Sequence, residues 1–241
     1  MHDGAFAAHS TNVKKDLLFA NFFSNIVFSK QKAMTGYQDY LIVLSPPENI
    51  VNRVKQLKDF SYHKIGEFES LYAKANIVIQ PWPRKKPVWI EPLIRKLVRD
   101  LQSLPPVVLD INGFGFFDQQ VYQTIYAKLN STPATKVWFK LLRKFFNTPA
   151  FEPHITIARN LPNEDFKKLW PFFKGLKWNE PFKIEQLTIL KREMIGHDKT
   201  YKVLREIPFN QKLNFNEFTY SKLKAPFSTL NKVNLQQISL F

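Results

Sequence analysis

The tripeptide His154-Ile155-Thr156 combines two side chains that can act together on a phosphate group. Alternation along a strand would place His154 and Thr156 on one face, about two residue rises apart, with Ile155 on the other. The hydroxyl can then donate a hydrogen bond to a non-bridging phosphate oxygen while the imidazole transfers a proton. Arg159 follows in the same segment and is a further candidate to bind phosphate. Taken alone, the tripeptide is more typical of an ordinary strand with a structural histidine.

A segment that lies 78 residues earlier resembles this one. Residues 73–79 (AKANIVI) align with residues 151–157 (FEPHITI), and each segment follows a helical stretch and precedes a helix. Asn76 then occupies the position of His154, and Val78 occupies that of Thr156. An amide cannot transfer a proton near neutral pH, and valine cannot donate a hydrogen bond. The alignment suggests a duplicated lobe in which Asn76 can bind a phosphate oxygen but cannot act as an acid or base.

The other histidines supply no obvious second acid or base. His63 and His197 are predicted in solvent-facing loops, and His2 and His9 fall in an irregular N-terminal stretch. The histidines show no metal-ligand spacing and no acidic cluster adjoins His154, so we expect neither a metal nor another cofactor. The segment Gly113-Phe114-Gly115 lacks the further glycine or lysine of a phosphate-binding loop and is interpreted as part of a strand bulge.

Hydrophobic periodicity predicts alternating strands and helices between residues 36 and 209. Strands are expected at about 40–44, 74–80, 107–111, 121–129, 154–159, 182–191 and 201–209, and helices around 50–57, 90–101, 137–145 and 166–170. Ser45 and Glu48 are spaced as a capping box for the first helix. A turn is expected at residues 196–198. Hairpins combined with crossover helices favour an α+β fold over a purely parallel sheet.

The composition indicates a packed and strongly basic protein. Hydrophobic residues make up 44% of the chain, and the formal net charge of +15 favours polyanionic partners such as RNA, nucleotides or anionic lipid. The absence of cysteine excludes disulfides and thiolate metal sites and suits a cytoplasmic location. No segment approaches the roughly 18 apolar residues of a membrane-spanning helix, and no signal-peptide cleavage pattern follows residues 17–28. We therefore expect a cytoplasmic monomer without membrane association.

A basic stretch follows the Asn76 segment. Residues 84–86 lie between Trp82 and Trp89, and further basic residues follow at positions 95, 96 and 99. Bases of a nucleic acid could stack on the tryptophans while the cations contact phosphates. The alternative is a solvated loop and helix face in which the tryptophans cover the core.

The segment Phe151–Arg159 (FEPHITIAR) closely resembles the second signature of the 2H phosphoesterase superfamily, which includes 2'-5' RNA ligases and cyclic phosphodiesterases. Residues 40–47 resemble the opening strand and turn of that family, and residues 187–192 with 201–204 resemble its final hairpin. The resemblance covers about residues 37–209. It implies a two-lobed, duplicated α+β fold, with mostly antiparallel sheets and flanking helices around a central cleft.

The resemblance also implies roles for individual residues. In this family two His-x-Thr/Ser strands act without a metal on 2',3'-cyclic or 2',5' phosphodiesters of RNA or nucleotides. His154 then corresponds to one proton-transfer histidine and Thr156 to one phosphate ligand, while Asn76 and Arg159 are candidate substrate-binding residues. Because the first motif is degenerate, we expect a weakened activity. Two alternatives stay open: a pseudoenzyme that binds RNA or a nucleotide, and a protein-interaction module that keeps only the fold.

Three parts are expected along the chain. Residues 1–35 are predicted to form a peripheral extension, residues 36–209 a domain of two pseudo-symmetric lobes, and residues 210–241 a polar C-terminal tail.

Overall fold

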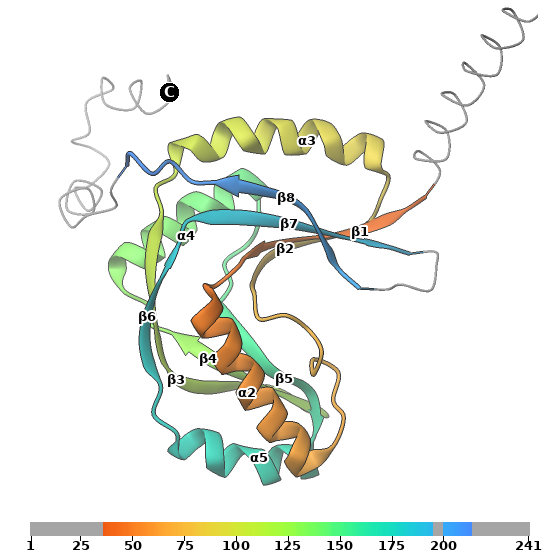
Figure 1. The fold of residues 1–241 in the computed structure, drawn as a ribbon, viewed down its shortest axis with the longest axis vertical. Coiled ribbons are helices and arrows are strands. Elements are labelled where there is room, and N and C mark those ends of the chain that lie inside the picture. Colours follow the sequence, from red (N-terminus) through yellow and green to blue (C-terminus); the bar gives the residue numbers. More distant parts are fainter. Residues whose placement is uncertain (1–35, 195–199, 214–241) are drawn as a thin grey trace, which may run out of the picture.

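Two four-stranded antiparallel sheets form the framework of the protein (Figure 1). The computed structural model describes residues 36–194 and 200–213. The first sheet has the order β2-β1-β7-β8, with β1 (Gln38–Leu44), β2 (Ile77–Lys85), β7 (Gln186–Glu193) and β8 (Lys202–Pro208). The second has the order β5-β4-β3-β6, with β3 (Val107–Gln119), β4 (Tyr122–Leu129), β5 (His154–Pro162) and β6 (Asn179–Ile184).

Within the described ranges, four α-helices flank these sheets: α2 (Glu48–Ile65), α3 (Pro87–Asp100), α4 (Pro133–Phe146) and α5 (Asn163–Gly175). A short 3₁₀ helix, η1 (Leu101–Ser103), follows α3. In Figure 1, α3 runs along the first sheet, whereas α2 and α5 pack together beside the second. The predicted α+β fold of two antiparallel sheets with flanking helices is confirmed. No helix among the described residues is both long and apolar enough to cross a membrane.

The two sheets are built from a repeated unit. The succession β1-α2-β2-α3 recurs as β4-α4-β5-α5, and equivalent strands occupy equivalent places in the two sheet orders. Each unit also carries a bulge at the same point. In β2 the pairing with β1 skips Ile79, and in β5 the pairing with β4 skips Ile157. These two residues are 78 positions apart, so the offset seen in the sequence is also the offset of a backbone irregularity.

One hydrophobic core connects both sheets with the helices. The apolar residues that alternate with the motif positions are all buried, as the strand periodicity predicts; they are Ile77, Ile79, Ile155 and Ile157. Burial of such side chains stabilises each strand by about 1.5–3 kcal/mol per residue. The opposite faces of these strands remain available for polar side chains.

The expected capping box at the start of α2 is wrong. Pro47 occupies the cap position, and no side chain caps the helix. Ser45 lies two residues before that cap, which is too far to reach the first free N–H groups of the helix. Its hydroxyl is bonded elsewhere, as described below.

Two further expectations differ from the structure. The strand expected at 182–191 is two strands, because the chain leaves the second sheet at Ile184 and enters the first at Gln186. Apolar alternation runs through both strands and carries no information about their partners. His63 lies in the last turn of α2 and not in a loop, although it is exposed. His2, His9, His197, the turn at 196–198, residues 1–35 and residues 214–241 lie outside the described residues.

Candidate active site

The two aligned segments lie at the edges of their sheets. Asn76 immediately precedes β2, and His154 is the first residue of β5. β2 is the outermost strand of the first sheet and β5 that of the second, and these two strands contact one another. The fold therefore places both halves of the repeated motif along the line where the sheets meet.

The motif side chains stand on the faces opposite the main core. Asn76 and Val78 alternate with buried isoleucines, and Val78 keeps 36% of its surface exposed. His154 and Thr156 are half-buried on the equivalent face of β5. The residue paired with Thr156 is Tyr126, which is buried but does not belong to the main core. The structure thus confirms that His154 and Thr156 share one face of a strand.

The bulge at Ile157 decides where Arg159 lies. Strict alternation would place Arg159 on the core face, together with Ile155 and Ile157. Because Ala158 pairs with core residue Ile125 while Thr156 pairs with Tyr126, Ile157 and Ala158 both face the core. Arg159 therefore returns to the face of His154, where it is exposed. The sequence suggested the residue, but not the bulge that makes it available.

The backbone of Glu152 fixes the orientation of the His154 ring. The distance from His154 Nδ1 to the carbonyl oxygen of Glu152 is 2.8 Å. Because a carbonyl can only accept, Nδ1 carries the proton of the neutral ring and Nε2 keeps its lone pair. Burial lowers the pKa of His154 below its usual value; the positive charge of Arg159 adds to this, and the bond to Glu152 opposes it. His154 is therefore neutral and able to accept a proton at pH 7.

Two aromatic rings enclose His154 within the second sheet. The centroids of Phe117 and Tyr126 lie 4.9 Å and 5.0 Å from that of the imidazole, and these two rings stack on one another at 4.3 Å. A Cβ at Gly115 would approach the Tyr126 ring to 2.7 Å, so only glycine lets the ring lie flat there. The register shift between Ile111 and Phe114 confirms the predicted bulge. The role of Gly115 was not predicted, although a glycine in a strand is a signal for such a close approach.

The equivalent site in the first sheet contains hydroxyl groups instead of aromatic rings. Ser45 Oγ donates to Asn76 Oδ1 at 3.1 Å and is hydrogen bonded to Thr188 Oγ1 at 3.2 Å. The bond through Oδ1 leaves the Asn76 Nδ2 group directed away from Ser45, with a 3.5 Å contact to the Lys74 carbonyl. Thr188 is only 1% exposed and pairs with Val43, the cross-strand neighbour of Val78. The sequence did not indicate Ser45 and Thr188 as site residues. Ser45 follows β1 and Thr188 lies in β7, and only the pairing of these strands brings both residues close to Asn76.

Charges of both signs surround the second motif, with Glu152 and Glu69 on the acidic side. Lys128 is paired directly with His154 across β4 and β5, and it is exposed. Arg159 Nη1 lies 3.9 Å from Glu69 Oε1, and both side chains are about half exposed. An exposed pair at this distance is worth about 0–1 kcal/mol, so an anionic ligand can compete for the guanidinium. Among residues 36–194 and 200–213, no three His, Asp or Glu side chains are grouped as a metal site would require.

The two tryptophans of the basic stretch differ in exposure. Trp89 is 59% exposed, with Lys86 Nζ 5.7 Å from its ring centroid. Trp82, in contrast, is half-buried and packs against Phe146. Trp82 therefore covers the core, whereas the exposed ring of Trp89 packs with Lys86.

Comparison with known proteins identifies relatives of this arrangement. The family model described as the 2'-5' RNA ligase superfamily matches residues 46–195. Among solved structures, TT0787 of Thermus thermophilus superposes with a TM-score of 0.53 at 15% identity, covering 73% of this chain and 100% of that one. E. coli LigT complexed with 3'-AMP gives 0.53 at 12% identity, with 73% and 99% covered. At these identities the structural likeness concerns the fold. A search of curated protein sequences gave no significant match.

Proposed function

The chain belongs to the 2'-5' RNA ligase superfamily, and on this basis we propose that it hydrolyses, at a reduced rate, a 2',3'-cyclic or 2',5'-linked phosphodiester of RNA or a nucleotide. One observation carries the proposal: His154, Thr156 and Arg159 occupy one face of an edge strand. There the Nδ1 atom of His154 is held by a carbonyl, which leaves Nε2 as the acceptor. The resemblance noted at residues 151–159 agrees with this membership.

His154 is the general base in this proposal. A water molecule attacks phosphorus and transfers a proton to Nε2 of His154, while the bond from phosphorus to the leaving ribose oxygen breaks. Thr156 Oγ1 and the Arg159 guanidinium hold the non-bridging oxygens, and Asn76 Nδ2 donates from the other strand. With an amide at position 76, the leaving oxygen takes its proton from solvent.

Ligands of the structural neighbours support a phosphate-containing substrate. E. coli LigT has been solved with 3'-AMP and with phosphate, in structures whose TM-scores to this chain are 0.53 and 0.51. The formal net charge of +15 favours such anions.

The reduced rate follows from the first motif. A positioned general acid or base typically contributes about 10²–10⁴-fold to a rate, and the amide of Asn76 cannot replace one. Val78 also lacks the hydroxyl that would hold a phosphate oxygen. We therefore expect slow turnover together with retained binding.

Hydrolysis of adenosine 2',3'-cyclic monophosphate tests the proposal directly. The purified protein should release adenosine monophosphate, and His154→Ala should reduce the rate to the background level. His63→Ala is the matched control, because His63 is exposed at the end of α2 and should leave the rate unchanged. Equal rates for the wild-type protein and His154→Ala would refute the proposed role of His154.

A second candidate function is binding without turnover, which the residues Asn76 and Val78 favour. In that case the wild-type protein should bind the same cyclic nucleotide at low salt and form no product. Substitution of Asn76 by histidine and Val78 by threonine, the family residues, should leave the affinity unchanged. Cytoplasmic location, a monomeric state and the domain limits 36–209 remain predictions.

A further inference from the structure

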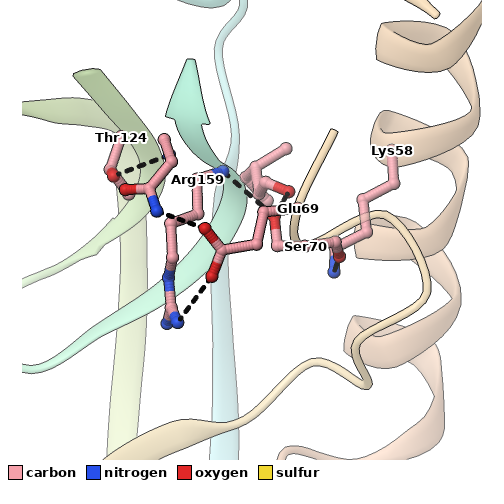
Figure 2. A network of polar contacts seen from close by, with 7 residues as sticks. Lys58, Glu69, Ser70, Thr124 and Arg159 are labelled. Carbon is pink, nitrogen blue, oxygen red and sulfur yellow. Dashed lines mark hydrogen bonds and ion pairs between the residues drawn. The ribbon is translucent and has the colours of Figure 1, made fainter. Parts of the chain in front are cut away.

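The loop between α2 and β2, residues 66–76, crosses from the first repeat to the second (Figure 2). It begins beside α2, runs along the free edge of β5 and ends at Asn76. Contacts of this loop with β5 come from Glu69 and Ser70. The loop that ends at Asn76 therefore also contacts β5, the strand that carries His154.

Ser70 satisfies two backbone groups on the free edge of β5. Its hydroxyl donates to the Ile157 carbonyl at 3.0 Å and accepts from the Arg159 N–H at 3.0 Å. These groups flank Ala158, at the bulge that turns Arg159 toward His154. Ser70 is only 5% exposed, so water cannot easily replace its hydroxyl. One side chain thus stabilises the local backbone shape on which the position of Arg159 depends.

Lys58 holds the loop in place from the side of α2. Its Nζ atom donates to the carbonyl oxygens of Ser70 at 2.5 Å and Ala73 at 2.6 Å. The residue is 3% exposed, and burial lowers the pKa of its ammonium group to about 8, with the charge of Arg159 contributing. A buried cation is tolerated only with good acceptors, and here both acceptors belong to the loop. Asn76 follows Ala73 by three residues.

Glu69 completes the contact from the neighbouring position. Its carboxylate receives a hydrogen bond from Asn160 Nδ2 and pairs with Arg159. Asn160 has a positive φ of 54°, which is rare outside glycine. Loop and strand are therefore joined on both sides of Arg159, by its backbone through Ser70 and by its side chain through Glu69.

The equivalent contact in the first repeat is of a different kind. There the loop after α4 reaches β2 through Thr148, which donates to the side-chain oxygen of Gln80 at 2.6 Å. This bond joins two side chains and leaves the backbone at the bulge of β2 unrestrained by it. Among the described residues, this tie from a loop hydroxyl to the strand backbone is found at β5, in the repeat that keeps its histidine and threonine.

We propose that Ser70, anchored by Lys58, is a positioning residue of the active site: it fixes the bulge of β5 and thereby presents Arg159 to the phosphate beside His154. This inference rests on the proposed function, because it concerns the same site and the same phosphate. Ser70 itself does not touch the substrate and acts through Arg159.

A double-mutant cycle tests the coupling between Ser70 and Arg159. For adenosine 2',3'-cyclic monophosphate, Ser70→Ala should raise KM about 10-fold with little change in kcat, since a lost phosphate contact weakens binding. In an Arg159→Ala background, the same substitution should have no further effect on KM. Ser70→Thr keeps the hydroxyl and should restore wild-type KM, and Ser103→Ala is the control for an exposed serine elsewhere. Additive effects of Ser70→Ala and Arg159→Ala would overturn the proposal.

Amide hydrogen exchange of Arg159 gives a readout that needs no turnover. Ser70→Ala removes the acceptor of this amide, so its exchange should accelerate at least about 10-fold while melting still shows a folded protein. Ser70→Thr should leave the exchange near the wild-type rate. Unchanged exchange in folded Ser70→Ala would refute the tie even if the enzyme is active.

The two measurements separate this proposal from the proposed function. A wild-type protein without turnover would contradict the hydrolysis, while fast Arg159 exchange in Ser70→Ala would still support the tie. Lys58→Met should reproduce the faster exchange by releasing the loop. If Lys58→Met does not fold, the exchange rate of the Arg159 amide in Ser70→Ala alone tests the proposal.

Discussion

The β2 and β5 halves of this protein share a backbone and differ in chemistry. Both strands are sheet edges, both bury two isoleucines, and both carry a bulge at the same position of the repeat. On the open face, however, β5 carries His154 and Thr156, whereas the β2 half has Asn76 and Val78. The burial that builds each strand comes from the other face, so the open face is free to change without loss of the fold.

The same difference extends to the surroundings of each motif. Around His154, two aromatic rings pack beside the imidazole, and burial lowers its pKa. Around Asn76, the hydroxyls of Ser45 and Thr188 form a hydrogen-bonded chain. The bulge presents Arg159 in one half and Pro81, its equivalent 78 residues earlier, in the other. The proposed proton transfer and anion binding therefore belong to one half, whereas the other half offers neutral hydrogen-bonding groups.

The largest difference should appear when each motif is truncated in turn. His154→Ala should lower kcat for adenosine 2',3'-cyclic monophosphate by about 10²–10⁴-fold, because it removes the only histidine of the two motifs. Asn76→Ala should lower kcat/KM by less than about 10-fold, because it removes one neutral hydrogen bond. Steady-state kinetics of both variants measure these two losses of activity relative to the wild-type protein. A larger loss for Asn76→Ala than for His154→Ala would reverse the assignment of roles.

Making the two halves alike should increase activity. The double variant Asn76→His with Val78→Thr should raise kcat about 100-fold, since it supplies an acid for the leaving oxygen. It should also add an alkaline limb to the pH–rate profile, whereas the wild-type rate should fall only toward acid, as His154 becomes protonated below pH 6.5. Val78→Thr alone serves as the control. A double variant with the wild-type rate and profile would show that the β2 half no longer faces the substrate.

Lys58 of α2, which anchors the loop that joins the two halves, should make stability depend on pH. The pKa of Lys58 falls from 10.5 to about 8 on folding, so the unfolded chain binds this proton more tightly. Between pH 8 and 10.5 the penalty for a buried charge disappears, and the free energy of unfolding should rise by up to about 3 kcal/mol. Urea unfolding across this range should show the rise relative to Lys58→Met, in which other titrating groups are unchanged. If the free energy of unfolding varied with pH in the same way for the wild-type protein and Lys58→Met, the lowered pKa of Lys58 would be contradicted.

The smallest expected effect concerns the aromatic surroundings of His154. Gly115→Ala should displace the Tyr126 ring and lower kcat about 10-fold or less, because the imidazole loses a packing surface and becomes more hydrated. The pKa of His154 should move up toward its usual value, which NMR titration can measure. Tyr126→Phe keeps the ring and should leave this pKa near that of the wild-type protein. An unshifted pKa in Gly115→Ala would show that burial by these rings is not its cause.

Local sequence was sufficient for those features that depend on strand or helix period. The shared face of His154 and Thr156, the burial of Ile155, and the correspondence with Asn76 and Val78 follow from alternation and alignment. These predictions hold because the backbone geometry of a strand fixes the direction of successive side chains whatever the strand packs against.

Features that depend on partners distant in the chain required the tertiary structure. Arg159 reaches the face of His154 only because of a bulge whose edge groups are bonded to Ser70, 89 residues earlier. Ser45 has the spacing of a helix cap, yet its hydroxyl bonds to Asn76 and Thr188, the latter 143 residues away. Such contacts are decided by which strands become neighbours, and apolar periodicity is the same for every choice of neighbour. The sequence therefore indicated which residues share a strand face, whereas the contacts that position them are a property of the assembled sheets.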